Sequence, residues 1–417
     1  MAEPGNQRMT VEASAWRTPA VILVVGCSIA VVGFGARSGL GFFLMPVSTA
    51  NGWGRDVFAL ALALQMLLWG AGQPFAGALA DRFGAPPVLC VGAVIYASGL
   101  ALMAYARTPL ELHLTAGVLI GFGMSGASFS LVIGAFGKLM PEQWRSLAFG
   151  AATAAGSFGQ FLFSPLSVAL IDQAGWQMAL VILGATVLLI IPLSPALLTP
   201  RRPAELAGAV AAQKQSVMQA LSEAFGHRSY VLLMLGYFTC GFQLFFIGIH
   251  LPAYLVDRGL PVEVGGWTLA IIGLFNIVGS IAAGWLGNLM PRRLILAAIY
   301  FLRSVAIFAY IMLPLSALST LIFGAFMGLL WLSTVPPTSS LVAIMFGTRW
   351  LTMLVGAAFF SHQVGGFLGV WLGGLLFEQT GSYDVVWWLT IFFGVASALI
   401  NLPIVEKPVA RMAQAPV

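Results

Sequence analysis

Two arginines, Arg37 and Arg303, lie within long apolar runs that contain no aspartate or glutamate. A guanidinium suits a carboxylate because its planar donors can bond both oxygens. Glycines surround Arg37 in the segment 33–41, which permits close helix approach or local unwinding. This pattern favours Arg37 as a binding or gating cation, and bonding to carbonyls at a helix kink is the alternative. For Arg303 a buried structural contact is the favoured prediction, and a coupling charge is the alternative.

Histidines and uncharged polar side chains occupy the same kind of run. His362 lies beside Gln363, and His250 follows Gln243 by seven residues, which places that pair on one face of a helix. Imidazole titrates near neutral pH, so either histidine could carry a proton, and a hydrogen-bonded packing role is the alternative for each. The remaining candidates for substrate contacts are Asn276, Trp331 and Thr334.

The composition excludes most soluble classes of protein. Of the 417 residues, 59% are hydrophobic and 8% are charged, whereas soluble domains carry about 25% charged residues. A cytosolic enzyme, a nucleic-acid-binding protein and a disordered scaffold are therefore excluded. The three cysteines lie in apolar runs and indicate neither a disulfide framework nor a metal cluster. With no P-loop and no HExxH segment, we expect no cofactor, no metal and no enzymatic activity.

Twelve apolar runs are long enough to cross a bilayer, which takes about 20 helical residues. Helices are expected because the runs lack the alternation of barrel strands. The runs are 20–47, 57–80, 87–106, 112–137, 146–169, 177–198, 230–254, 266–289, 294–314, 319–345, 351–377 and 385–404. In the tenth run, Pro336 and Pro337 predict a break in the helix. The sequence therefore predicts an all-α polytopic protein surrounded by lipid.

The basic residues predict which way the helices point. With the N-terminus placed in the cytoplasm, the outer loops hold three of the 19 Lys and Arg residues, namely Arg55, Arg107 and Arg258. The excess in the other loops fits the positive-inside rule. We therefore predict a multi-pass protein of the bacterial inner membrane with both termini in the cytoplasm.

The longest polar interruption, 199–229, divides the chain into an N-terminal six-helix half, 1–198, and a C-terminal six-helix half, 230–417. An internal repeat supports this division, because a glycine-rich segment at 77–84 recurs in weaker form at 284–288, about half the chain later. Two six-helix halves joined by a cytoplasmic loop are typical of transporters.

The segment Gly77-x-Leu79-Ala80-Asp81-Arg82-x-Gly84 resembles the loop motif of the major facilitator superfamily, and the resemblance extends over essentially the full chain. It implies twelve helices in two pseudo-symmetric halves, alternating access around a central cavity, and a monomer. It also implies a gate at Gly77, Asp81, Arg82 and Gly84. In the second half Asn288 replaces the acid of the motif, so the gating ion pair is expected in one half alone.

Three further segments, 175–176, 331–338 and 360–363, resemble the monocarboxylate-porter and oxalate/formate-antiporter branch. Ser280 stands at about the position where that branch often carries an anion-binding arginine. The substrate chemistry of the branch is therefore not carried over intact.

These observations predict a secondary active transporter of a small organic anion, a mono- or dicarboxylate, that works by rocker-switch alternating access. Arg37 would hold the carboxylate, and protons or an exchanged substrate would drive transport because no nucleotide-binding segment is present. One alternative is a transporter of larger amphipathic or aromatic compounds such as drugs or vitamins. The other is a membrane sensor that does not transport.

Overall fold

The computed structural model describes residues 16–198, 216–347 and 350–409. Within these ranges the chain forms helices joined by short turns, without strands. The predicted loop 199–229 lies mostly outside the described residues. The side chains of a few helical residues, Asp81 and Arg82 among them, also lie outside the described part.

The N-terminal half contains nine α-helices and three short 3₁₀ or π segments among its described residues. In chain order these are α1 (Pro19–Ser38), η1 (Leu40–Phe43), α2 (Leu44–Asn51), α3 (Arg55–Phe83), α4 (Ala85–Met103), α5 (Pro109–Leu112), η2 (His113–Leu119), α6 (Ile120–Gly126), α7 (Phe129–Leu139), α8 (Glu142–Val187), α9 (Ile190–Leu193) and η3 (Ser194–Leu197). The first predicted run is interrupted at Gly39, and the fourth at Ala127 and Ser128. These two interruptions place irregular backbone in the middle of the first half.

The C-terminal half consists of longer helices and one interrupted span. In chain order these are α11 (Val217–Gly226), α12 (Arg228–Asp257), α13 (Val262–Leu286), α14 (Arg292–Met312), α15 (Ala317–Leu330), α16 (Val335–Phe346), α17 (Leu351–Thr380) and α18 (Asp384–Asn401). The interruption between α15 and α16 covers residues 331–334. The predicted break is present, and it lies just before Pro336, which occupies the first turn of α16.

Eleven stretches of the described chain are long and apolar enough to cross a membrane. One of them, Gly150–Leu197, contains Gly175, whose backbone has a left-handed φ of 78° and divides two crossings. Glycine tolerates such a φ because it has no Cβ. The described residues thus contain twelve candidate crossings, and the predicted all-α fold is confirmed.

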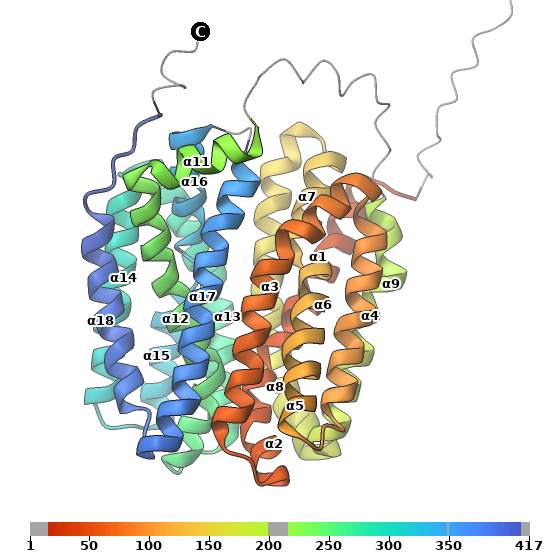
Figure 1. Cartoon of the computed structure of the whole chain (residues 1–417), viewed down its shortest axis with the longest axis vertical. Helices are drawn as coiled ribbons and strands as arrows, with labels where there is room; N and C mark the ends of the chain where they lie inside the picture. Colours follow the sequence, from red (N-terminus) through yellow and green to blue (C-terminus); the bar gives the residue numbers. More distant parts are fainter. Residues whose placement is uncertain (1–15, 199–215, 348–349, 410–417) are drawn as a thin grey trace, which may run out of the picture.

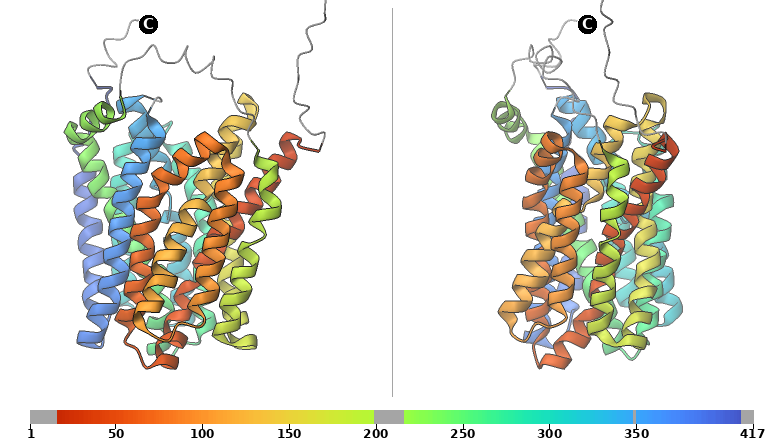
Figure 2. Two further views of the ribbon diagram at one scale, coloured as in Figure 1. Left: turned by 45° about the vertical axis from the view of Figure 1, so that its right-hand side comes forward. Right: turned by 90° about the vertical axis from the view of Figure 1, so that its right-hand side faces the viewer.

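The two halves lie side by side (Figure 1), and both run the full height of the bundle (Figure 2). We call the end where α1 begins and α18 ends the terminal end, and the other the opposite end. The main contacts between the halves pair α3 with α17, α8 with α13, and η1 and α2 with α12. Each half has its own apolar core, and a few side chains, such as Phe245 and Phe42, cross into the core of the other half.

Candidate functional site

Arg37 lies in the last turn of α1, where the helix ends at Gly39. The residue is 7% exposed, and its Nη2 donates to the Sδ atom of Met66, 2.8 Å away. The guanidinium carbon lies 4.4 Å from the ring centre of Phe245 and 5.4 Å from that of Trp69. Its Nε atom has no hydrogen-bond partner, and no described carboxylate pairs with it. A thioether and two ring faces leave much of this cation's hydrogen-bonding capacity unused.

His362 of α17 lies beside the same aromatic rings. Its ring stacks on Phe359 at 5.5 Å and packs against Phe245 at 5.4 Å, and Phe359 in turn contacts Trp69 at 5.5 Å. The Nδ1 atom is 3.2 Å from the side-chain oxygen of the neighbouring Gln363, and Nε2 has no partner. We call Arg37, Trp69, Phe245, Phe359 and His362 the central cluster. It draws on α1 and α3 from one half and on α12 and α17 from the other.

Gln363 joins the two halves next to this cluster. Its side-chain nitrogen donates to the backbone oxygen of Met66 at 3.2 Å. Met66 is also the residue that accepts from Arg37. His362 shares the ring of Phe245 with Arg37, and Gln363 shares Met66 with it. Both predicted residues therefore lie close to Arg37.

Arg303 is fully buried in α14 and occupies a different environment. Its Nε donates to the carbonyl oxygen of Leu330 at 3.0 Å, and its Nη2 donates to the carbonyl oxygens of Leu330 and Trp331. These acceptors are free because α15 ends at Leu330. The side-chain oxygen of Gln243 lies 3.5 Å from Nη1. Arg303 therefore bonds carbonyls at a helix break.

The other predicted contacts are brought to separate places. Gln243 donates to the carbonyl oxygen of Thr390 at 2.9 Å, and the Thr334 hydroxyl lies 3.3 Å from the Cys240 sulfur. Trp331 is buried beside Arg303. Gln243 and Trp331 thus contact Arg303, and Thr334 contacts Cys240 in the same half.

His250 and Asn276 also have protein partners. The Nε2 atom of His250 lies 2.8 Å from the carbonyl oxygen of Val370, nearer the opposite end. Asn276 accepts from the backbone nitrogen of Leu332 at 2.9 Å and donates to the hydroxyl of Ser157, across the two halves, at 2.8 Å. Within the described residues, neither side chain contacts a member of the central cluster. Buried polar groups usually find such partners.

The predicted gating motif lies at the terminal end, where α3 turns into α4. Gly84 makes this turn with a φ of 91°, and Gly77 faces open space. The side chains of Asp81 and Arg82 lie outside the described residues, so their role in a latch stays a prediction.

An ion pair that the sequence did not predict joins the two halves at the opposite end. Arg55, the first residue of α3, donates from Nη1 and Nη2 to the two carboxylate oxygens of Asp257 on α12, at 2.5 and 2.6 Å. The Tyr383 hydroxyl accepts from the same guanidinium at 3.0 Å, and the backbone nitrogen of Arg55 donates to Glu378 at 2.6 Å. Burial raises the pKa of Tyr383 to about 12, so its hydroxyl stays neutral at physiological pH. Arg55 belongs to the first half, and its three partners belong to the second.

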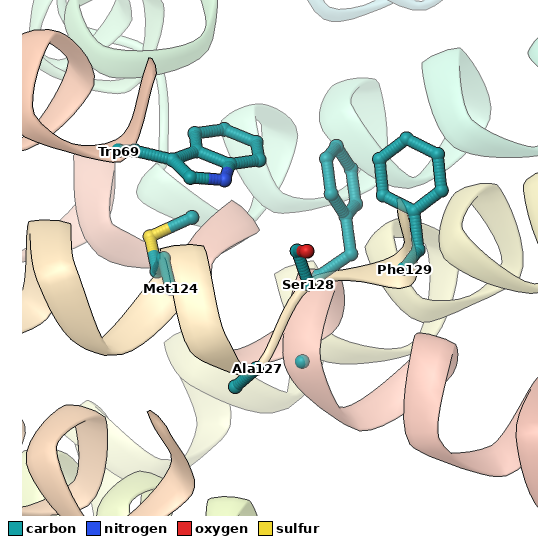
Figure 3. Close-up of a pocket in the computed structure, with 7 residues that line it drawn as sticks. Trp69, Met124, Ala127, Ser128 and Phe129 are labelled. Carbon is teal, nitrogen blue, oxygen red and sulfur yellow. The ribbon is translucent and has the colours of Figure 1, made fainter. Parts of the chain in front are cut away.

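A small pocket adjoins the central cluster on the side of the first half (Figure 3). Trp69 lies on one side of it and Phe129 on the other, with Ser128 between them. Phe34 and Met124 complete the side-chain lining. The Nε1 atom of Trp69 is buried without a partner, whereas Ser128 accepts from Gln73 at 2.7 Å. We call this the aromatic pocket.

The family model for the Major Facilitator Superfamily matches residues 26–370, which is most of the chain. The chain belongs to this superfamily. The resemblance inferred from the segment 77–84 is therefore confirmed. The relatives and the fold are those of transporters and not of enzymes, so this superfamily member is a transporter with a small-molecule substrate.

Relatives and solved structures support the same family. The MFS-type transporter YcxA of Bacillus subtilis, itself uncharacterised, is 29% identical over 90% of this chain and 92% of its own length. Monocarboxylate transporter 11 of mouse is 28% identical over 83% of this chain and 77% of its own. The fold matches the xylose transporter XylE of E. coli with a TM-score of 0.72 at 14% identity, covering 93% and 96% of the two chains.

Proposed function

We propose that this superfamily member transports a small organic anion whose carboxylate pairs with Arg37. The observation that carries the proposal is the contrast between the two arginines inside the membrane. Arg303 bonds two carbonyl oxygens and lies beside a third oxygen, whereas Arg37 has a thioether, two rings and an unpartnered Nε. A cation in the bilayer interior costs about 2.5–3.5 kcal/mol even on insertion scales. An anion that arrives as cargo would offset this cost.

His362 could bind the proton that crosses the membrane together with the anion. Its Nε2 atom is unpartnered, and its ring shares Phe245 with Arg37. An imidazole nitrogen without a partner can accept a proton. An anion and a proton that cross together form a nearly neutral unit, so we propose proton coupling through His362, with substrate exchange as the other mode.

Alternating access would proceed from a state closed at the opposite end. The ion pair between Arg55 and Asp257 joins the halves there. At the terminal end, by contrast, α7 and α16 make their main contacts with helices of their own half. If the basic loops face the cytoplasm, as the positive-inside rule indicates, the closed end faces outward. The inner-membrane location and the cytoplasmic termini belong to the same proposal.

Counterflow in proteoliposomes tests the role of Arg37. Vesicles loaded with one monocarboxylate should accumulate the same radiolabelled acid, and a panel of monocarboxylates with and without a pH gradient identifies those that are carried. We expect Arg37→Gln to lower the initial rate at least tenfold, because a charge-assisted hydrogen bond contributes about 1.5–3 kcal/mol. Arg37→Lys should retain part of the activity, because it keeps the charge without the planar fork.

Arg107→Gln is the matched control, because Arg107 is exposed at the opposite end. It should transport at the parental rate. Elution as a single species and an unchanged Tm would show that both variants are folded. Parental counterflow by Arg37→Gln would refute the proposal.

A further inference from the structure

We infer that the cargo is a monoanion with an apolar, aromatic body, and that the end of this body enters the aromatic pocket. This inference rests on the proposed function, because it takes the carboxylate to be held by Arg37. It goes further by assigning a second subsite and by excluding dicarboxylates and polyhydroxy acids as preferred cargo.

The aromatic pocket lies where the body of such a cargo would reach. Phe34 and Gly33, which line the pocket, precede Arg37 by three and four residues, so they share a face of α1 with it. One helical turn, about 5.4 Å, separates these positions along the axis. Trp69 belongs to both sites, since its ring lines the pocket and its centre lies 5.4 Å from the Arg37 guanidinium. A small molecule with its carboxylate at Arg37 would therefore bring the edge of its ring to the pocket, about one turn away.

The side chains that line the pocket indicate which chemical groups the apolar part of the cargo carries. Phe34, Trp69, Met124 and Phe129 offer ring faces and a thioether, which pack well against an aromatic ring. The Ser128 hydroxyl already accepts from Gln73. Among the lining side chains, the unpartnered buried polar atom is Trp69 Nε1 (Figure 3). A chain of hydroxyl groups would therefore lose its hydrogen bonds to water without finding enough partners here.

The number of available cations determines the charge of the cargo. Arg303 is engaged by carbonyl oxygens and Arg55 by Asp257. Of the three buried arginines in the described residues, Arg37 is therefore the one whose guanidinium lacks an oxygen partner. A second carboxylate on the cargo would be buried without a counter-charge, which is strongly unfavourable.

The size of the pocket limits how much of the cargo's aromatic part can enter it. Its volume is about 10 Å³, room for about one water-sized group. The edge of a ring or a methyl substituent fits, and a second fused ring does not. Removal of the Phe129 ring should enlarge the pocket and admit a larger body.

Counterflow with a graded set of acids tests this subsite. The set is phenylacetate, 1-naphthylacetate, lactate and succinate, each measured with the parent, Phe129→Ala and Phe129→Leu. We expect the parent to prefer phenylacetate at least tenfold over lactate and succinate. Phe129→Ala should raise the ratio of naphthylacetate to phenylacetate transport about tenfold, and Phe129→Leu should raise it less. Phe326→Ala is the control, because Phe326 is exposed on α15, and it should leave the ratio unchanged.

The outcomes separate the two proposals. If lactate or succinate is preferred and still requires Arg37, the anion site stands and the aromatic subsite is wrong. An unchanged ratio in both Phe129 variants would overturn the subsite as well. If Arg37→Gln transports every acid as the parent does, the proposed function itself fails. Should Phe129→Ala not fold, the ratio measured with Phe129→Leu decides.

Discussion

The ion pair between Arg55 and Asp257 should control how often the opposite end opens, and Asp257→Asn tests this directly. The pair is bidentate, and its side chains are 11% and 27% exposed. Removing one partner of a buried pair costs about 3–5 kcal/mol. Partial exposure lowers this figure, and asparagine keeps one oxygen as an acceptor. We therefore expect a loss of about 2 kcal/mol, near the value of one charge-assisted hydrogen bond.

This free energy acts on the conformational equilibrium because the two residues belong to different halves. The bonds exist when the halves meet at the opposite end and are lost when they separate. A loss of about 2 kcal/mol changes the ratio of closed to open molecules about thirtyfold, since 1.36 kcal/mol corresponds to a factor of ten. Asp257→Asn should therefore shift the population towards conformations that are open at this end.

Electron spin resonance distance measurements can detect the shift. Spin labels at Tyr105→Cys in the first half and Glu263→Cys in the second report the separation of the halves, because both positions are exposed near the opposite end. The labels are introduced after the native cysteines, Cys27, Cys90 and Cys240, have been replaced by alanine. Asp257→Asn should increase the fraction of long distances.

Two further variants separate the ion pair from general effects of charge. Arg258→Gln removes a 3.8 Å pair with Asp384 that is more than half exposed and lies within the second half, so it should leave the distances unchanged. The charge-swapped double variant Arg55→Asp with Asp257→Arg should restore part of the short-distance population. Identical distance distributions for the parent, Asp257→Asn and Arg258→Gln would refute the reasoning.

Two predictions concern the packing that supports the site. Arg303→Lys should lower the Tm in a fluorescence melting assay, because an ammonium lacks the fork that bonds both Leu330 and Trp331; lost transport with an unchanged Tm would instead assign Arg303 a functional role. Gly241→Ala should lower the Tm strongly, because its added Cβ would overlap the carbonyl of His362, whereas Gly248→Ala on the same helix meets no atom within 4 Å and should be neutral. Equal effects of the two alanines would contradict this account of how α12 packs on α17.

The sequence was sufficient to predict the helices because a bilayer demands about 20 apolar residues in each crossing. Their interruptions were predicted less well. Pro336 and Pro337 indicated the break in the tenth span, but its position at residues 331–334 involves Arg303, which bonds the freed carbonyls from another helix. The interruption at Ser128 has no comparable proline signal. Such positions depend on tertiary contacts that no local pattern contains.

The candidate residues illustrate the same limit. Arg37 and Arg303 are alike in sequence, since both are arginines in acid-free apolar runs. Their environments differ because the acceptors of Arg303 lie 27 and 28 positions away in the chain. Arg55 is predicted as an outer-loop charge, and its partner Asp257 lies 202 positions away in the chain. The sequence did contain one signal for this ion pair. The two residues carry opposite charges, belong to different halves and are expected at the same end of the membrane.

The three buried arginines of the described residues differ in the partners of their guanidinium groups, and this difference connects binding with movement. Arg55 has a carboxylate from the other half, and Arg303 has carbonyls of its own half. Arg37 contacts Met66 of its own half and the ring of Phe245 from the other. An anion that pairs with Arg37 would compete with its contact to Phe245, which joins the halves. Binding of cargo would thereby weaken contacts at the middle of the interface, as a transporter requires if its loaded form is to change conformation.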